Sequence, residues 1–358
     1  MSNSYIDLSA VTFTADEIRD FNELIRVDTL EAPALTALHP IETDIRNDQN
    51  IGFIGSDIGL IGKAVQGCGT QTYDNKQFPA TQKVWSPKRW EVPMQFCWTD
   101  VSSNLLRFLR KLGADVVNLE STPIMAFFLE LLQPNLQRML FRYTWFNDTD
   151  AANTDDSPSG VLTEGVDVTY FNLFNGAFRQ LSDIITTTPA RKTNIAANEQ
   201  ASYALQDSAY SNEQAFTDLF SVIDDAPLIL TLDPSARILV THSVWRRVMR
   251  HLQTKSIVFE LDRTINGMPL MRFDGYEIIS MPMWDAMIRA YEKDGTKYNN
   301  PHRILMTTGN NIPIGLEGND FFLNADIWHE KKDKYTYVRL IDAMDVKVLR
   351  DDLVQYGI

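Results

Sequence analysis

The feature that most constrains the fold is a strict alternation of apolar and polar side chains between Trp90 and Trp98. A period of two over this length is typical of a β-strand. Pro87 and Pro93 favour a strand at the edge of a sheet, because proline cannot donate a hydrogen bond to a neighbouring strand. If residues 63–98 form a hairpin, each leg has roughly 17 residues and reaches roughly 55 Å. An arm of that reach is difficult to bury within its own domain.

A glycine-rich run precedes the alternating stretch. Six glycines lie between residues 52 and 69, so this run cannot be a stable helix and indicates flexible or tightly turning chain. It contains no nucleotide-binding loop, since Gly62-Lys63 is followed by Ala64 where serine or threonine is required. The dinucleotide pattern GxGxxG is also absent.

Three of the seven tryptophans, Trp85, Trp90 and Trp98, lie on the proposed arm. Tryptophan is enriched among the residues that anchor protein interfaces. We therefore expect Trp85 and Trp90 to contact another subunit. The alternative, a local aromatic cluster packed on a long helix, stays open and applies best to Trp98. The basic residues that could steer the arm toward an acidic partner surface are Lys76, Lys83, Lys88 and Arg89.

The charge of the chain is distributed in blocks. The net charge is −14, of which residues 1–60 carry −8, residues 61–146 carry +4 and residues 147–235 carry −11. Such a chain lacks the overall basic footprint of a protein that grips nucleic-acid phosphates. The acidic blocks either serve solubility or attract the basic block of a neighbouring copy.

Helices and strands are both expected, which gives an α+β fold. A Ser211/Gln214 capping box indicates a helix over 212–223, and Asp274-Gly275 between two short apolar runs indicates a hairpin. Pro134 is expected to kink or split a long helix over 123–145. Further helices are expected at 14–25, between Asp100 and Gly113, at 170–186 and at 244–252, and further strands at 238–240, 303–308 and 335–349.

No group of residues predicts catalysis, a bound cofactor or a metal. The five histidines are scattered without zinc-ligand spacing, and the acidic loop at 148–156 lacks the glycine and final glutamate of a calcium loop. Neither Cys68 nor Cys97 lies in a basic, helix-start setting that would activate a thiol. We therefore expect no catalytic, cofactor-binding or metal-binding residues, and a protein that is not an enzyme.

Membrane insertion and secretion are not expected either. The most apolar stretch, residues 124–146, is interrupted by glutamate, glutamines, a proline and two arginines. The first ten residues are polar and have no basic start, so we expect no signal peptide.

The order of these elements resembles the major capsid proteins of tailed bacteriophages, whose fold is shared with encapsulin shells. An arm, a long hairpin and a long helix come first. A strand and helix (RILVTHSVWRRVMRHL), a hairpin (NGMPLMRFDGYEII) and a late strand pair (YTYVRLIDAMDVKVL) follow. The resemblance covers roughly residues 15–358. It concerns the order and the lengths of the elements, and the sequence contains no diagnostic motif of the family.

The resemblance implies a division of the chain into four parts. These are an N-terminal arm (1–50), an extended β-hairpin loop (51–99), a peripheral domain with a long spine helix (100–147 and 326–358) and an axial domain (148–325).

It also implies a function, which is self-assembly through hexamers and pentamers into the icosahedral shell around the double-stranded DNA genome of a tailed phage. The implied partners are further copies of the chain, a portal, a separate scaffolding protein and packaged DNA held without sequence-specific contacts. No cofactor and no membrane are implied, and the implied location is the virion capsid, assembled in the host bacterial cytoplasm. The alternatives are an encapsulin-like protein compartment and a cytosolic α+β enzyme with an unrecognised site.

Overall fold

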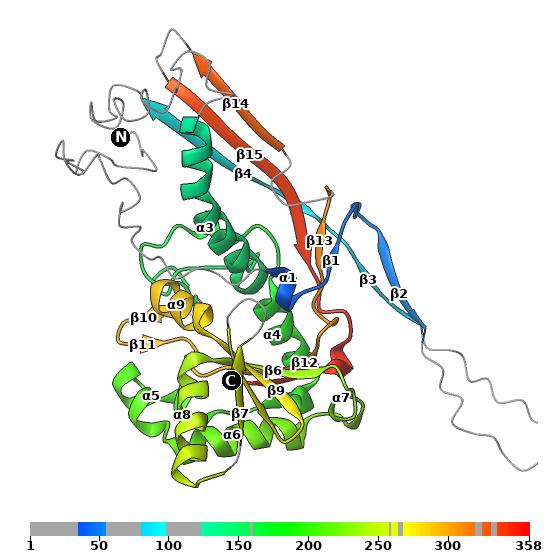
Figure 1. Ribbon diagram of the computed structural model, residues 1–358, viewed down its shortest axis with the longest axis vertical. Helices are drawn as coiled ribbons and strands as arrows, with labels where there is room; N and C mark the ends of the chain where they lie inside the picture. Colours follow the sequence, from blue (N-terminus) through cyan, green and yellow to red (C-terminus); the bar gives the residue numbers. More distant parts are fainter. Residues whose placement is uncertain are drawn as a thin grey trace, which may run out of the picture.

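The computed structural model describes residues 35–54, 80–97, 123–157, 160–257, 259–263, 268–318, 324–330 and 335–358. The described chain is organised around two sheets. One carries long strands that run beside a long helix, and the other lies in a lower body with helices around it (Figure 1). Several predictions fall outside the described residues: the helices at 14–25 and between Asp100 and Gly113, most of the glycine-rich run, Lys76 and Trp98.

The lower body is built on a mixed sheet of seven described strands. In order across the sheet they are β5 (Lys192–Thr193), β16 (Val354–Gly357), β12 (Ile304–Thr308), β6 (Ala236–Thr241), β9 (Tyr276–Met281), β8 (Pro269–Phe273) and β7 (Glu260–Arg263).

Both faces of this sheet are covered. Along β6, Ile238 and Val240 pack with α6 (Asn212–Asp225) and α8 (His242–Thr254), whereas Leu239 belongs to the core on the other side. Alternate residues of a strand point to opposite faces, so an unbroken apolar run is what a strand buried on both faces requires.

The other sheet has five described strands. They are β1 (Ile41–Glu42), β13 (Ile314–Leu316), β15 (Tyr335–Val346), β14 (Asn324–Glu330) and β4 (Lys88–Cys97). β15 is the centre of the sheet, with β4 along one side and β14 and β13 along the other. β4 is therefore an edge strand among the described residues, as Pro93 within it and Pro87 just before it predict.

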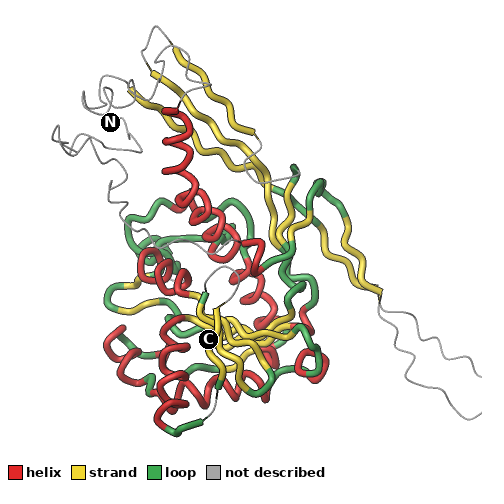
Figure 2. The backbone as a smooth tube through the Cα atoms, in the orientation of Figure 1, coloured by secondary structure: helices red, strands yellow, loops and turns green. Residues whose placement is uncertain are grey.

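The helix α3 (Pro123–Phe146) runs beside the long strands β4 and β15 into the lower body (Figures 1 and 2). It is one helix of 24 residues, about 36 Å long. Pro134 does not end it, so of the two expected effects of this proline the split into two helices is wrong, and a kink stays a prediction. Its C-terminal end lies in an aromatic core, where the ring of Trp145 is 4.7 Å from that of Trp284 and 5.2 Å from that of Phe178.

The remaining described elements are short. They are α1 (Leu35–Leu38), β2 (Asn50–Ile54), β3 (Ala80–Val84), α4 (Ala177–Thr187), α5 (Tyr203–Ala209), α7 (Leu228–Thr231), α9 (Pro282–Tyr291), β10 (Lys293–Asp294), β11 (Lys297–Tyr298) and the 3-10 turns Val168–Tyr170, Pro189–Arg191, Ala196–Glu199 and Asp351–Leu353.

Two local predictions are confirmed in detail. The Ser211 hydroxyl accepts a hydrogen bond from the Gln214 amide at 3.0 Å and caps α6. Asp274 and Gly275 have φ angles of 51° and 82°, the left-handed pair that a two-residue hairpin turn requires, and they join β8 to β9.

The helix expected at 170–186 begins later, at Ala177. A 3-10 turn and a loop precede it, and Gly176 forms its N-terminal boundary. A Cβ at Gly176 would lie 3.0 Å from the Tyr143 carbonyl oxygen and from the Asn147 amide. The late start thus follows from close packing of α4 against the end of α3.

The predicted hairpin over residues 63–98 is wrong in its pairing. Residues 50–54 pair with residues 80–84, so β2 and β3 form the projecting hairpin (Figure 1). Residues 88–97 instead pair with β15 over their whole length. The alternation identifies the strand but not its partner, which lies about 250 residues away in the chain.

The implied domain boundaries differ from the sheets in four places. β1 lies within residues 1–50 and β4 lies within residues 51–99, but both belong to the sheet of β15. β13 lies within residues 148–325 but belongs to the same sheet as β15. β16 lies within residues 326–358 but pairs with β12 in the lower body. The chain therefore crosses between the two sheets at β13 and at β16.

Candidate assembly surfaces

The projecting hairpin is fixed at its base by Trp85. The Trp85 amide donates to the Gln49 carbonyl at 2.9 Å, and its own carbonyl accepts from the Asp48 amide at 2.9 Å. The next amide, of Ser86, donates to the Asp345 carboxylate at 2.7 Å. Both legs are thus tied to each other and to β15.

Both tryptophans expected at a subunit contact are buried in their own chain. Trp85 is 0% exposed and Trp90 is 3% exposed. Trp90 lies on β4 opposite Asp342 and packs into the core that includes α3. Neither indole is available to fill a groove on a neighbouring subunit. Trp90 packs in the core that includes α3, as in the alternative that the sequence left open, whereas Trp85 lies against Gly315 of β13.

The expected steering cations have different surroundings. The Lys83 ammonium lies 2.9 Å from the Asp351 carboxylate and lines a shallow cleft of about 270 Å³ together with α4. The Arg89 guanidinium lies 3.8 Å from Glu317, and Lys88 is exposed. Lys83 therefore braces the hairpin within its own subunit, and Lys88 and Arg89 remain candidates for contact with another.

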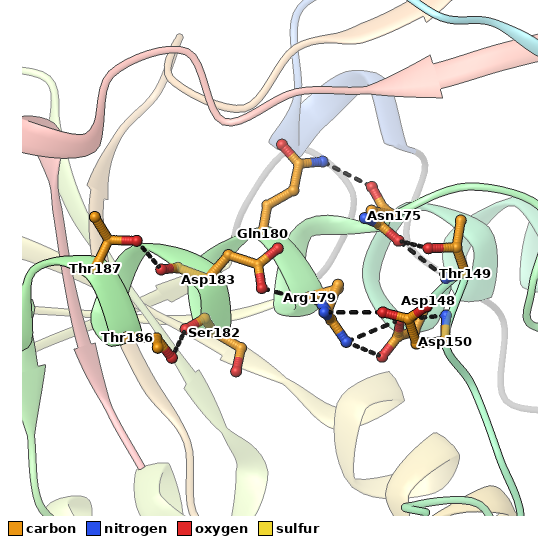
Figure 3. Close-up of polar contacts among 10 residues, drawn as sticks. All are labelled: Asp148, Thr149, Asp150, Asn175, Arg179, Gln180, Ser182, Asp183, Thr186 and Thr187. Atoms are coloured by element: carbon orange, nitrogen blue, oxygen red, sulfur yellow. Dashed lines mark hydrogen bonds and ion pairs between the residues drawn. The ribbon is translucent and has the colours of Figure 1, made fainter. Parts of the chain in front are cut away.

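Arg179 on α4 joins this helix to the loop that follows α3 (Figure 3). Its guanidinium lies 3.1 Å from each of the carboxylates of Asp148, Asp150 and Asp183. Beside it, the Gln180 side chain donates to the Val346 carbonyl at 2.7 Å and accepts from the Val348 amide at 2.9 Å. The end of α3, the helix α4 and the end of β15 are thereby held together.

A polar cluster in the lower body contains the residue types of a catalytic triad. The Ser243 hydroxyl lies 3.0 Å from Nδ1 of His302, but Asp285 instead accepts the amides of His242 and Ser243 at 2.6 and 3.2 Å. Burial raises the pKa of Asp285 to about 6 against the opposing effect of those amides, and burial lowers the pKa of His302 to about 4. The carboxylate caps α8 and does not orient the imidazole, so these residues do not form a nucleophile–base–acid relay.

No group of three or more histidine, cysteine, aspartate or glutamate side chains among the described residues is placed to hold a metal ion. None of the described helices has the length and apolarity needed to cross a bilayer.

One exposed feature was not anticipated from the sequence. Leu228, Ile229 and Leu232 are 72%, 50% and 73% exposed and form an apolar surface on and directly after α7, here termed the α7 ridge. The available signal was the short apolar run LILTL between acidic residues, which resembles a buried segment when read from sequence alone.

Comparison with known proteins gives a likeness of fold. No protein-family model matches the chain, and no curated protein sequence matches it significantly. Among solved structures, the capsid of the cyanophage P-SCSP1u aligns over 100% of this chain and 98% of that one, with 13% identity and a TM-score of 0.50. The mature capsid of bacteriophage PhiM1 aligns over 92% and 87%, with 9% identity and a TM-score of 0.50.

The chain has the fold of the tailed-phage major capsid proteins. The α+β class expected from the sequence is confirmed, as is the resemblance in fold. At these identities the likeness concerns the fold alone, and it extends over both sheets, since each alignment covers most of the two chains.

Proposed function

We propose that this chain is the major capsid protein of a tailed phage, which assembles into the icosahedral shell around a double-stranded DNA genome. The observation that carries the proposal is the likeness of fold to a phage capsid protein along the whole chain. A fold alone does not define a function, but a projecting hairpin on an elongated body suits a subunit that must overlap its neighbours.

The parts of the chain take the following roles in this proposal. Residues 1–50 form the N-terminal arm. Residues 51–99 contain the extended loop, of which β2 and β3 are the described base, and β4, which joins the sheet around β15. α3 and the sheet around β15 form the peripheral domain, and the lower body forms the axial domain, which lines the five-fold and six-fold axes. Lys88 and Arg89 are the surface cations available to a neighbouring subunit, and Lys76 and Lys83 lie on the same loop.

The proposed partners follow from a shell that encloses DNA. They are further copies arranged in hexamers and pentamers, a portal, a separate scaffolding protein and DNA bound without sequence preference. The net charge of −14 supports confinement of DNA over tight binding, because phosphate contacts require clustered basic residues. Assembly takes place in the host bacterial cytoplasm, and the finished protein resides in the virion.

Electron microscopy of the expressed full-length chain, alone and with the other head proteins of its phage, tests the proposal. Closed shells of uniform size are expected. A chain that stays a 41 kDa monomer under all assembly conditions, and shows a turnover activity, would overturn it. Particles that enclose cargo protein in place of DNA would indicate the encapsulin-like alternative. A melting temperature that rises with a nucleotide would favour the enzyme alternative.

A further inference from the structure

The α7 ridge is a contiguous exposed apolar surface formed by several neighbouring side chains. Three of its five consecutive residues are large aliphatic side chains that are at least half exposed, while Leu230 between them is 0% exposed and anchors the turn in the core. Leu228 and Leu232 are four residues apart and therefore lie side by side. Isolated exposed leucines are ordinary, but a contiguous apolar surface marks an interaction site.

Acidic residues flank the ridge on both sides in the sequence. The segment from Asp224 to Asp233 contains three aspartates and no basic residue. Asp224 and Asp225 are exposed at the end of α6, two residues before α7. Asp233 follows α7 and lies close enough to Arg350 for that cation to help lower the pKa of its carboxyl group. An apolar centre with a negative rim favours a partner surface that carries positive charge.

The helix α8 of the same domain offers such a surface. The segment from Arg246 to Lys255 contains four lysines and arginines and no acidic residue. Arg247 is already paired with Asp207 on α5. Arg246, Arg250 and Lys255 are exposed, and no ion pair with another described residue involves them. The basic face of α8 thus lacks a counter-charge within the described part of its own subunit.

The two surfaces lie on opposite flanks of the lower body, with α6 between them (Figure 1). They cannot meet within one subunit. In a closed ring of identical subunits, each copy must present two different complementary surfaces, one to each neighbour. The ridge and the α8 face have the charge and the placement for such a head-to-tail contact.

We infer that the α7 ridge of one copy packs against the Arg246 and Arg250 face of α8 in the next copy around a rotation axis. This inference rests on the proposed function, and it adds the surface through which adjacent axial domains associate. The leucines supply the buried apolar area, and the aspartates and arginines set the orientation of the two subunits and make the contact sensitive to salt.

The first test replaces the apolar centre of the ridge. Assembly of the full chain is followed by light scattering and electron microscopy as a function of subunit concentration. The double variant Leu228→Ser/Leu232→Ser is expected to raise the concentration needed for assembly by about tenfold or more, with an unchanged melting temperature of the free subunit. Leu261→Ser on β7 is the matched control, because Leu261 is 54% exposed but lies outside the ridge.

The second test exchanges charges across the contact. Asp224→Arg and Arg250→Glu are each expected to weaken assembly, and the chain that carries both is expected to recover most of the loss. Recovery requires that the two positions meet between copies, because within one subunit they lie on different flanks.

The outcomes separate this contact from the proposed function. Assembly of the double leucine variant at the wild-type concentration, or a double charge variant no better than either single one, overturns the contact while the capsid function stands. Shells that form normally but no longer incorporate another head protein assign the ridge to that protein and also overturn the contact. A wild-type chain that never assembles removes both proposals.

Discussion

The indole ring of Trp85 lies against the backbone of Gly315 so closely that no side chain fits between them. A Cβ at Gly315 would lie 2.9 Å from Cζ3 of Trp85 and 2.5 Å from Cδ1 of Ile45. Gly315 is in the middle of β13, which pairs with β15. The base of the projecting hairpin is therefore seated on the sheet by a tryptophan and a glycine that are far apart in the sequence.

Trp85→Ala is expected to destabilise the free subunit by about 3–5 kcal/mol, because it leaves a large cavity where a fully buried indole was. Urea unfolding of unassembled subunits measures this loss. Val84→Ala is the matched control, since Val84 is the preceding residue and is 36% exposed. A Trp85→Ala subunit as stable as the wild type, but unable to assemble, would return Trp85 to the role of a contact with a neighbour.

Gly315→Ala is expected to cost about 1–3 kcal/mol, since the added methyl group collides with Trp85 and Ile45. Adding Ile45→Val removes the closest atom, Cδ1, and is expected to recover part of this loss. Urea unfolding of Gly315→Ala, of Ile45→Val and of the chain with both changes gives the coupling free energy between the two positions. Strictly additive effects would mean that Ile45 is not what the new methyl group meets.

Glu292 and Arg303 form an ion pair that is almost fully removed from solvent, with side chains 8% and 3% exposed. The Arg303 guanidinium also lies 4.4 Å from the centre of the Phe178 ring. Glu292→Gln is expected to cost about 3 kcal/mol or more, because it leaves a buried cation without a counter-charge.

A double-mutant cycle tests this pair. Glu292→Gln together with Arg303→Met is expected to cost less than the sum of the two single changes. Glu277→Gln, which removes the exposed partner of Arg272, is the control and is expected to change stability by only about 0–1 kcal/mol. If Glu292→Gln and Glu277→Gln lowered the free energy of unfolding by the same amount, the buried pair would be no more important for stability than the exposed one, contrary to this prediction.

Local signals in the sequence predicted much of the lower body. The Asp274-Gly275 turn and the Ser211 cap depend on residues within a few positions of one another, so their chemistry is readable from a short segment. The order of elements was also sufficient to recognise the fold.

Contacts between distant segments were not readable in this way. The alternation in β4 specifies a strand with one apolar face, but it does not say that β15 and α3 cover that face. For this reason the sequence indicates a subunit contact for Trp85 and Trp90, although their own chain buries them. The α7 ridge was missed for the converse reason, because an apolar run in a sequence does not show that it lies at the surface.

Stability is expected to fall in mild acid, and His39 is a principal cause. Its ring is buried beside Trp145, and Nδ1 lies 2.8 Å from the Ile312 carbonyl oxygen, to which it donates. Burial lowers the pKa of His39 from 6.5 to about 3. Between these values the unfolded chain takes up a proton that the folded chain does not. The stabilising effect is complete above pH 6.5 and declines by up to about 1.4 kcal/mol per pH unit as the pH falls toward 3.

Other buried groups modify this profile. The lowered pKa of His302, about 4, adds a loss in the same direction. The raised pKa of Asp285, about 6, acts in the opposite direction, since its protonation favours the folded state as the pH falls from 6 toward 3.8. Burial likewise lowers the pKa of His242 and raises the pKa of Asp218 and of Glu292. The contribution of His39 is therefore measured by substituting that residue alone.

Unfolding curves of His39→Gln between pH 4 and pH 7 test the assignment. The variant is expected to be less stable than the wild type at pH 7 and to lose less stability on acidification. His251→Gln serves as the control, because His251 lies partly exposed on α8 against Phe216. Parallel pH profiles for the wild type and His39→Gln would show that His39 does not set the acid response.

Lys88→Glu with Arg89→Glu tests whether these cations face a neighbouring subunit. Both side chains are exposed, and the Arg89 guanidinium lies 3.8 Å from the Glu317 carboxylate. The free energy of unfolding of the free subunit is therefore expected to change by only about 0–1 kcal/mol. Lys83 is left intact in this variant, because its pairing with Asp351 braces the hairpin.

The double variant Lys88→Glu/Arg89→Glu is expected to change how shell assembly depends on salt concentration. Attraction between exposed charges on adjacent subunits is screened over about 10 Å at 0.1 M salt. Wild-type assembly should therefore weaken as salt rises, whereas the doubly reversed variant should assemble poorly at low salt and improve as salt screens the new repulsion. Lys293→Glu, an exposed lysine on β10, is the control. If all three proteins show the same salt profile, Lys88 and Arg89 face solvent in the shell and the contact lies elsewhere on the subunit.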